Sequence, residues 1–372
     1  MKAIGIILAG GNNNRMKELT AKRAVPALPV AGSFRSIDFA LSSMSNSHIQ
    51  TVAVLTQYNA RSLNEHLSSA KWWNFGRKQG GLFLFTPTVT ADNSDWYRGT
   101  ADAMYQNIDF LKRRHEPYVI ISSGDCVYKL DFNRVLDFHI EKKSDITVVC
   151  KDMMYNDDVS RFGVVRMDDE SRITEFDEKP IEVSSNTIST GIYVIRRRQL
   201  IELLEAAAEE NRFDFVNDIL VRYKNVKKIY GYKINSYWNN IADIDAYFKT
   251  NMDFLRPDVR SYFFREEPTI CSKVDDLPPA KFNPGSDISN SLVSSGCIIN
   301  GSVEDSVLFK QVFVGKNTTV KNCVILNDVY IGDNVHLENC IVESRGTINP
   351  NTCYCGEDGV MIVKEKNVRY VI

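Results

Sequence analysis

The stretch VFVGKNTTVKNCVILND (residues 312–328) is followed directly by VYIGDNVHLENCIVESR (residues 329–345), and the two align without gaps. Aliphatic side chains recur every six residues in two series, Leu308, Val314 and Val320, then Ile325, Ile331 and Leu337. Such a period, with Gly or Asn beside it, is typical of a hexapeptide β-helix, in which each flat side places one aliphatic side chain inward. A small sandwich with fortuitous spacing is the alternative, which two gapless copies disfavour.

Before the repeat, apolar runs alternate with helical periodicity through about residue 250. The runs predict strands at residues 4–8, 51–55, 81–85, 118–122, 145–150, 188–195 and 228–234. Amphipathic segments between them, such as residues 100–114 and 132–142, predict helices. This alternation indicates a doubly wound, mostly parallel, Rossmann-like α/β sheet, whose ligands bind at the carboxyl ends of the strands.

The chain of 372 residues is long enough for at least two domains of roughly 150 residues. We expect an α/β domain over residues 1–255, a linker rich in Pro, Ser and Asp over residues 256–290, and a β-helix over residues 291–372. A coil with so few turns usually supports assembly, because its open ends and flat faces need covering.

The charge balance is nearly neutral, with 45 Lys and Arg against 47 Asp and Glu and a net charge of −2. This balance argues against nucleic acid or a membrane as a partner. The apolar stretch at residues 3–9 is too short for a signal-peptide core or a membrane span, so we expect a cytoplasmic protein.

The eight cysteines have no zinc-finger spacing, since the close pair Cys353 and Cys355 is separated by one residue. Free, buried thiols are therefore expected in a reducing compartment. The five histidines form no ligand-spaced group along the sequence. We therefore expect no transition-metal site.

The loop LAGGNNNRM (residues 8–16) follows the first predicted strand. Gly10 and Gly11 allow close backbone approach to a phosphate, and Arg15 could clamp one. A tight turn without a binding role is the alternative for this loop taken alone.

Six further motifs follow in order: VLTQYN (54–59), WYRGTADAMYQN (96–107), SSGDCVYKLD (122–131), FDEKP (176–180), STGIYV (189–194) and SYWNNIADIDAY (236–247). The set resembles the sugar-phosphate nucleotidyltransferases, and most closely the glucose-1-phosphate adenylyltransferase (ADP-glucose pyrophosphorylase) family of bacterial glycogen synthesis. The resemblance covers nearly the whole chain and implies that the C-terminal β-helix is left-handed.

The resemblance implies that ATP and glucose 1-phosphate react by in-line attack on the α-phosphate, with pyrophosphate leaving. It assigns the nucleotide to Gly10, Gly11, Gln57, Gly99 and Thr100. It assigns the sugar phosphate to Glu178, Lys179, Ser189 and Gly191. Arg15 would remain as a catalytic residue. Asp125, which could otherwise be a capping or turn residue, would be one of two carboxylates on Mg²⁺.

Three departures from the family pattern fall on the reaction centre. Asn240 stands at the second metal carboxylate of a W-x-D-V-G-T motif, where Ala242 also replaces the Gly. Val25 stands at a phosphate-neutralising Lys, and Asn13 at the last Gly of the first loop. Because Mg²⁺ favours anionic oxygens, the amide of Asn240 is a poor ligand. Together these losses predict activity lower by roughly 10⁴-fold or more.

Two milder departures are Cys126, where catalytic relatives usually have His, and Ser33, where some relatives use a Lys for a phosphorylated activator. The chain is most similar to the second, catalytically impaired subunit (the GlgD type), which pairs with a catalytic subunit in a heterotetramer. We expect such a partner, with a homo-oligomer of the isolated chain as the alternative. Two other functions stay open, an active adenylyltransferase with its metal on Asp125 and Asp243, and a sugar-phosphate or nucleotide sensor.

Overall fold

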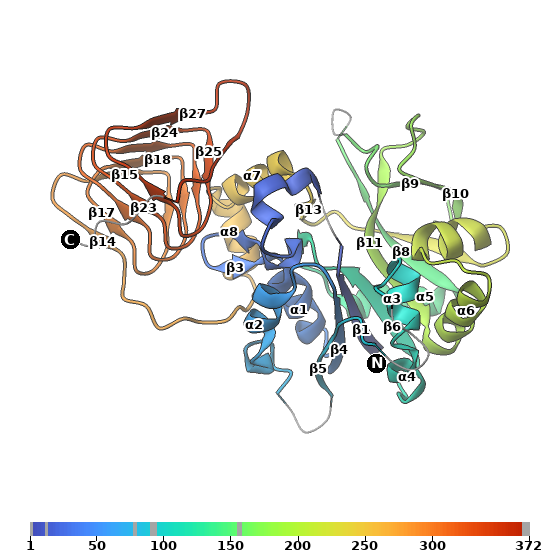
Figure 1. Cartoon of the computed structure of the whole chain (residues 1–372). Coiled ribbons are helices and arrows are strands. Elements are labelled where there is room, and N and C mark those ends of the chain that lie inside the picture. The colour runs from blue at the N-terminus through green and yellow to red at the C-terminus, as the bar shows by residue number, and fades with distance from the viewer. Residues whose placement is uncertain (1–2, 12–13, 77–79, 90–94, 155–157, 367–372) are drawn as a thin grey trace.

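An α/β domain and a C-terminal β-helix lie side by side in the computed structural model (Figure 1). The structure describes residues 3–11, 14–76, 80–89, 95–154 and 158–366. Among these residues, no helix combines the length and the apolar character needed to cross a membrane.

The α/β domain is built on a nine-stranded sheet with the main order β10-β9-β11-β6-β1-β4-β5, while β8 and β12 extend from β11. The strands are β1 (Ala3–Ala9), β4 (Thr51–Thr56), β5 (Gly81–Phe85), β6 (Tyr118–Ser123), β8 (Ile146–Asp152), β9 (Gly163–Met167), β10 (Ile173–Glu178), β11 (Thr187–Arg196) and β12 (Ile229–Lys233). All seven expected strands are present, and β9 and β10 are additional. The sheet is mixed, because β11 runs antiparallel to β6 and β8.

Helices cover both faces of this sheet. The helices of the domain are α1 (Ser36–Asn46), α2 (Arg61–Leu67), α3 (Thr100–Tyr105), α4 (Ile108–Lys112), α5 (Phe132–Glu141), α6 (Arg197–Glu209), α7 (Ile244–Asp253) and α8 (Pro257–Phe264). Of these, α7 and α8 pack at the junction with the β-helix rather than on the sheet. Alternating side chains of β1 enter different cores: Ile7 joins the cluster of α1 and α5, and Ile6 joins that of α3 and α6. The α/β domain is therefore doubly wound, as predicted.

The helix expected at residues 100–114 is divided into α3 and α4. Asn107, at the break, donates from Nδ2 to the Ala103 carbonyl oxygen at 2.9 Å and to the Tyr97 hydroxyl at 2.9 Å. A side chain that bonds to the backbone in this way competes with the helical hydrogen-bond pattern. Apolar periodicity alone does not reveal that competition.

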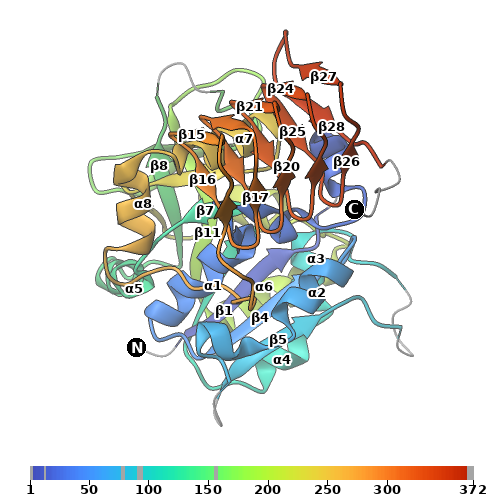
Figure 2. The same ribbon diagram turned by 90° about the vertical axis from the view of Figure 1, so that its left-hand side faces the viewer.

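The β-helix consists of three parallel sheets of five strands each (Figure 2). The first holds β14 (Lys281–Phe282), β17 (Ile298–Ile299), β20 (Phe313–Val314), β23 (Tyr330–Ile331) and β26 (Thr347–Ile348). The second holds β15 (Asp287–Ser289), β18 (Ser302–Glu304), β21 (Thr319–Lys321), β24 (His336–Glu338) and β27 (Cys353–Cys355). The third holds β16 (Leu292–Val293), β19 (Val307–Leu308), β22 (Val324–Ile325), β25 (Cys340–Val342) and β28 (Met361–Val363).

The six-residue period observed in the sequence corresponds to the interior of this coil. Val314, Val320 and Ile331 are fully buried. Corners hold Asn residues with positive φ, and Asn334 donates from Nδ2 to Asn351 Oδ1 at 3.0 Å in the next coil. Asn tolerates the left-handed conformation and adds a side-chain ladder between coils.

The segment expected as a linker, residues 256–290, differs from that expectation. It contains α8, which begins at Pro257, and the first two β-helix strands, β14 and β15. The first coil lacks the buried aliphatic of later coils, since Phe282 is 51% exposed. The hexapeptide period therefore does not mark where the β-helix begins.

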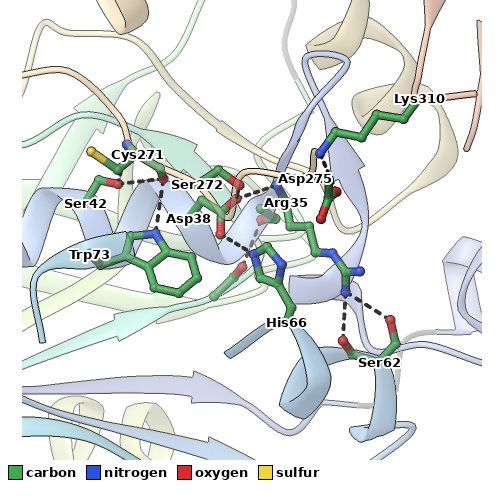
Figure 3. Close-up of polar contacts among 12 residues, drawn as sticks. Arg35, Asp38, Ser42, Ser62, His66, Trp73, Cys271, Ser272, Asp275 and Lys310 are labelled. Carbon is green, nitrogen blue, oxygen red and sulfur yellow. Dashed lines mark hydrogen bonds and ion pairs between the residues drawn. The ribbon is translucent and has the colours of Figure 1, made fainter. Parts of the chain in front are cut away.

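Between α8 and β14 the chain crosses α1 and is fixed there by side chains (Figure 3). Ser272 Oγ donates to Asp38 Oδ2 at 2.6 Å, and Asp38 Oδ1 contacts His66 Nε2 at 2.6 Å. Trp73 Nε1 donates to the Cys271 carbonyl oxygen at 3.1 Å. The connection is thus an ordered strap along the α/β domain.

The two domains share an apolar junction beside α7 and α8. Phe39, Tyr247 and Phe254 of the α/β domain belong to one buried cluster with Phe309 and Val324 of the β-helix. The remaining structured segments are β2 (Pro29–Val30), β3 (Phe34–Arg35), β7 (Cys126–Tyr128), β13 (Trp238–Asn240) and short helical turns at Asn14–Thr20, Val25–Ala27, Ala70–Trp73 and Val216–Val221.

Candidate active site

A cavity of about 770 Å³ opens where β1, β4 and β6 end. Its lining includes the predicted residues Gly10, Gly11, Arg15, Val25, Gln57, Gly99, Thr100, Asp125, Glu178, Lys179, Ser189, Gly191 and Asn240. Asn13 lies outside the described residues. The fold thus brings together positions spread over more than half of the chain, while their individual roles stay predictions.

One wall, the β10–β11 wall (Glu178, Lys179, Ser189 and Gly191), holds the residues predicted for the sugar phosphate. Glu178 Oε1 lies 3.3 Å from Lys179 Nζ. Burial raises the pKa of Glu178, and the Lys179 charge partly offsets this. The wall therefore offers one cation and one carboxylate, a set suited to a sugar phosphate.

Close packing of Gly163 on β9 fixes the position of Glu178. The two residues pair across β9 and β10, and a Cβ at Gly163 would lie 3.0 Å from Glu178 Oε2 and 2.8 Å from the Phe176 ring. On β11 the register shifts between Ser189 and Tyr193, and Gly191 within this irregularity has φ +74°. A positive φ favours glycine, so the backbone of β11 departs from regular strand geometry at Gly191.

The residues predicted for the nucleotide form the opposite rim. Gln57 accepts from the Tyr97 amide at 2.7 Å and donates to the Tyr97 carbonyl oxygen at 3.3 Å. Its amide therefore orients the segment that leads into Gly99. A Cβ at Gly99 would lie 2.4 Å from the Phe213 carbonyl oxygen, so only glycine fits. Thr100 Oγ1 accepts from the Phe215 amide at 2.8 Å.

The second wall, the β7–β13 wall (Asp125, Asn240 and Val25), holds the positions that depart from the family pattern. Asn240 pairs with Cys126 across β13 and β7, which places it beside Asp125. Asn240 Nδ2 donates to Cys126 Sγ at 3.4 Å, and Asn240 Oδ1 accepts from the Ala242 amide at 3.0 Å. Both ends of the amide are thus used within the protein.

The donor set of this wall fits a magnesium ion poorly. Asp125 Oδ1 already accepts from Ser123 Oγ at 2.5 Å and from Cys126 Sγ at 3.4 Å. Burial, and then the Asp125 charge, raises the pKa of the Cys126 thiol well above its usual value, which keeps the thiol protonated. Mg²⁺ requires anionic or water oxygens in near-octahedral order, and here one carboxylate faces an engaged amide and a thiol.

Val25 completes the β7–β13 wall as an apolar side chain. It is 5% exposed and belongs to the buried cluster that includes Met16, Leu19 and Ile241. An apolar group cannot neutralise the charge of a phosphate, so the cation expected at this position in catalytic relatives has no counterpart in Val25.

Arg161 is a lining residue that the sequence did not single out. Its guanidinium forms an ion pair with Asp243 and lies 4.8 Å from the centre of the Phe162 ring. Asp243 also caps α7 by accepting from the Ala246 amide at 2.7 Å. The carboxylate considered as a second metal ligand is therefore engaged by an arginine. Two arginine positions, Arg15 and Arg161, line the cavity near this wall.

The cavity lies at the carboxyl ends of strands of a doubly wound sheet, which is where such folds bind their ligands. The family model described as "Nucleotidyl transferase" matches residues 4–256, and "GlmU-like, C-terminal hexapeptide" matches residues 278–362. The chain belongs to the glucose-1-phosphate adenylyltransferase family, which confirms the resemblance seen in the motifs.

Three relatives show the extent of this similarity, each described as glucose-1-phosphate adenylyltransferase. The chain is 39% identical to that of Geobacillus stearothermophilus over 365 residues, which cover 97% of this chain and 94% of the relative. It is 38% identical to that of Clostridium novyi (strain NT) over 320 residues, 85% of this chain and 84% of the relative. It is 36% identical to that of Bacillus subtilis (strain 168) over 322 residues, 86% and 84% respectively.

Proposed function

We propose that this protein is the regulatory, catalytically impaired subunit of ADP-glucose pyrophosphorylase. It would raise the activity of a catalytic subunit that converts ATP and glucose 1-phosphate to ADP-glucose and pyrophosphate. The observation that carries the proposal is Asn240, whose amide is bonded to Cys126 Sγ and the Ala242 amide beside Asp125.

The chemistry explains why this position is decisive. Attack on the α-phosphate moves negative charge onto the leaving pyrophosphate, and catalysis consists mainly of neutralising that charge and aligning the reactants. The β7–β13 wall offers Asp125 but no second carboxylate at Asn240 and no cation at Val25. Removing one such group typically costs about 3 kcal/mol, or roughly 10²- to 10³-fold in rate, so with both groups missing we expect turnover reduced by roughly 10⁴-fold or more.

The outer face of the first β-helix sheet supports an assembly role. Ile298, Phe313 and Tyr330 occupy cross-strand positions in register, and the rings of Phe313 and Tyr330 stack at 4.8 Å. Ile298 is 39% exposed. An apolar row on a flat, accessible sheet face suits burial against a second subunit.

The proposal is tested by assaying the purified chain alone and mixed with a catalytic subunit, with ATP, glucose 1-phosphate and Mg²⁺. We expect negligible turnover alone, a mixed oligomer by light scattering, and altered kinetics of the catalytic subunit. Phe313→Glu should abolish the mixed oligomer and the kinetic effect, whereas Ser302→Glu, on the neighbouring sheet, should leave both unchanged. Turnover of about 10 s⁻¹ by the chain alone would contradict the proposal.

Two other functions remain as alternatives. An active adenylyltransferase would need Asp243 as a metal ligand, and the ion pair with Arg161 counts against that role. A sugar-phosphate sensor is favoured by the β10–β11 wall, which retains Glu178 and Lys179. Calorimetric binding of glucose 1-phosphate without any mixed oligomer or kinetic effect would support the sensor.

A further inference from the structure

The second β-helix sheet carries a group of metal-ligand side chains on its outer face. His336 on β24 lies opposite Cys353 on β27, and Glu338 lies opposite Cys355. Side chains two residues apart on a strand share a face, so all four lie together, while Leu337 between them is fully buried in the coil. The strand register therefore brings together a histidine, a carboxylate and two thiols that show no ligand spacing along the sequence.

The ligand atoms of His336, Glu338 and Cys355 all lie within 4.8 Å of one another. Cys353 Sγ adds a fourth candidate, 3.6 Å from Cys355 Sγ. No second group of this kind occurs in the part of the chain that the structure describes. The two strands face each other one coil apart, which places His336 and Cys353 seventeen positions apart in the sequence.

We propose that His336, Glu338, Cys353 and Cys355 bind a zinc-class divalent ion on the outer face of the β-helix. Two thiolates, one imidazole and one carboxylate form the soft-to-borderline set that Zn²⁺ prefers over Mg²⁺ or Ca²⁺. Bond lengths of about 2.0 to 2.3 Å place tetrahedral ligand atoms about 3.5 Å apart. Side-chain rotations that move the ligand atoms of His336, Glu338 and Cys355 by about 1 Å would bring them to that spacing.

The backbone beneath this group is rigid, which favours a defined site. The His336 amide donates to the Thr352 carbonyl oxygen at 3.0 Å, and the Gly356 amide donates to the Glu338 carbonyl oxygen at 3.0 Å. Ligands placed on paired strands lose little freedom when an ion binds. Cys353 is exposed and Cys355 half-buried, so an ion can enter from solvent.

Charges around the group are compatible with an ion. His336 Nε2 lies 3.5 Å from Glu338 Oε2, and Lys321 Nζ on β21 lies 4.0 Å from Glu338 Oε1. Lys321 is 45% exposed, so its long side chain can swing away when an ion takes the carboxylate. The net charge of two thiolates and one carboxylate would be balanced by the ion and this lysine.

A disulfide between Cys353 and Cys355 is the competing use of the same thiols. Alternate residues of a strand have Cα atoms about 6.6 Å apart. Disulfides usually join Cα atoms about 4.4 to 6.8 Å apart, most often near 5.5 to 6 Å. An extended strand thus places this bond at the far end of its range, and the parallel pairing of β27 holds the strand extended.

The test is a Co²⁺ titration of the full chain after chelator treatment and removal of the chelator. We expect one ion per chain, with thiolate charge-transfer and tetrahedral absorption bands that Zn²⁺ abolishes. Cys355→Ser and His336→Gln should each weaken Zn²⁺ binding, measured against a chromophoric chelator, by at least about 100-fold, since even outer-shell partners cost 10- to 100-fold. Cys271→Ser, which removes an exposed thiol elsewhere, should leave the affinity unchanged.

The folded state is followed separately, so that a misfolded variant is not mistaken for a lost ligand. Zn²⁺ should raise the melting temperature of the parent chain and of Cys271→Ser but not that of Cys355→Ser, with all three showing the same circular dichroism. No tetrahedral Co²⁺ spectrum, unchanged affinity in His336→Gln, or a Cys353–Cys355 disulfide in the chelator-treated chain would each overturn the proposal. The site lies outside the active-site cavity, so none of these results bears on the proposed function.

Discussion

The two walls of the candidate active-site cavity stand on different sheets, the nine-stranded sheet and the two-stranded β7–β13 sheet, and they differ in where their polar atoms are directed. On the β10–β11 wall, Glu178 and Lys179 line the cavity, and burial shifts the pKa of Glu178 upward. On the β7–β13 wall, the amide of Asn240 and the carboxylate of Asp125 are bonded to neighbouring protein groups. The first wall thus presents a charged pair, Glu178 with Lys179, to the cavity, whereas the polar atoms of Asn240 and Asp125 bond to uncharged neighbouring groups.

The backbone of the β7–β13 wall is regular although its side chains depart from the family pattern. β13 still pairs with β7 in register, and the Ile241 amide still donates to the Asp125 carbonyl oxygen at 2.9 Å. Backbone pairing depends on strand geometry rather than on whether position 240 holds a carboxylate or an amide. The side chains that distinguish the two walls should therefore be exchangeable without loss of the fold.

The largest expected effect comes from repairing the β7–β13 wall. Asn13→Gly, Val25→Lys and Asn240→Asp combined should raise pyrophosphorolysis of ADP-glucose by at least about 100-fold over the parent chain, because they return a carboxylate and a cation to the reaction centre. The assay follows ATP formation in the presence of Mg²⁺.

The matched control replaces Val25→Lys with Val25→Met, which supplies a long side chain without charge. This control should recover much less activity than the full repair. A folded, monodisperse repaired chain that stays inactive would mean that other positions also prevent catalysis, and would contradict the assignment of the defect to these three.

The next effect contrasts two glycines on different parts of the cavity. Gly163→Ala places a Cβ against Phe176 and Glu178, so it should weaken glucose 1-phosphate binding about tenfold and cost about 1–3 kcal/mol of folding stability. Gly11→Ala meets nothing within 4 Å and should change neither quantity noticeably. Titration calorimetry and urea unfolding measure the two quantities, and equal effects of both substitutions would contradict the packing argument.

A smaller effect concerns pH on the intact wall. Because burial raises the pKa of Glu178, its carboxylate should protonate, and its bonds to sugar hydroxyls should be lost, at a pH above the ordinary value of 4.5. Glucose 1-phosphate affinity should fall as pH decreases through this raised pKa. In Glu178→Gln that component of the pH dependence should disappear, leaving only the titration of the phosphate. An identical pH profile for both chains would show that Glu178 is not a ligand.

The same raised pKa has a consequence for folding with the opposite dependence on pH. A carboxyl group whose pKa is higher in the folded chain binds its proton more tightly there, so its contribution to stability is present at low pH and is lost as pH rises through the folded pKa. Glu178→Gln should therefore gain stability relative to the parent chain as pH rises from about 4 to 7.

The fold was predictable from the sequence wherever the buried side chains form a continuous or periodic pattern of apolar residues. The apolar runs of β1, β4 and β6 and the aliphatics at Val314, Val320 and Ile331 are such signals. Strands β9 and β10 were missed; in β10 the buried Ile173 and Phe176 are three residues apart, because the register shifts between Ile173 and Glu175, so the alternation typical of a strand is lost. The antiparallel direction of β11 was not predicted either, because the pattern of apolar residues does not show in which direction a strand runs.

The site was predictable where its residues belong to a contiguous sequence motif. It was not predictable where two residues meet only because the fold brings different strands or helices together. Most of the residues named from such motifs line the cavity. Arg161 was not predicted because a single charged residue forms no motif with its sequence neighbours. Its ion-pair partner, Asp243, lies on a different element, far away in the sequence. The group of His336, Glu338, Cys353 and Cys355 was not predicted because it depends on the register between β24 and β27, which the sequence does not give directly.

The smallest expected effect comes from Asn240→Asp alone, which tests whether a single carboxylate restores metal binding to the β7–β13 wall. Asn240→Asp keeps an acceptor for the Ala242 amide but loses the donor to Cys126 Sγ and sets a second negative charge beside Asp125. Without Mg²⁺ this should cost about 1 kcal/mol and lower the melting temperature by about 2–4 °C, because like charges repel in a partly buried site.

Adding Mg²⁺ should reverse the loss in Asn240→Asp, since an ion that binds only the folded state stabilises it, by about 2.7 kcal/mol at a concentration a hundredfold above its dissociation constant. The parent chain and Asn240→Ala should show no such gain, because neither provides a second carboxylate. Scanning calorimetry with and without Mg²⁺ measures the difference. A gain of the same size in the parent chain would mean that Asp125 and the amide already hold the ion, and the contrast between the two walls would then lie in Val25 and Asn13 instead.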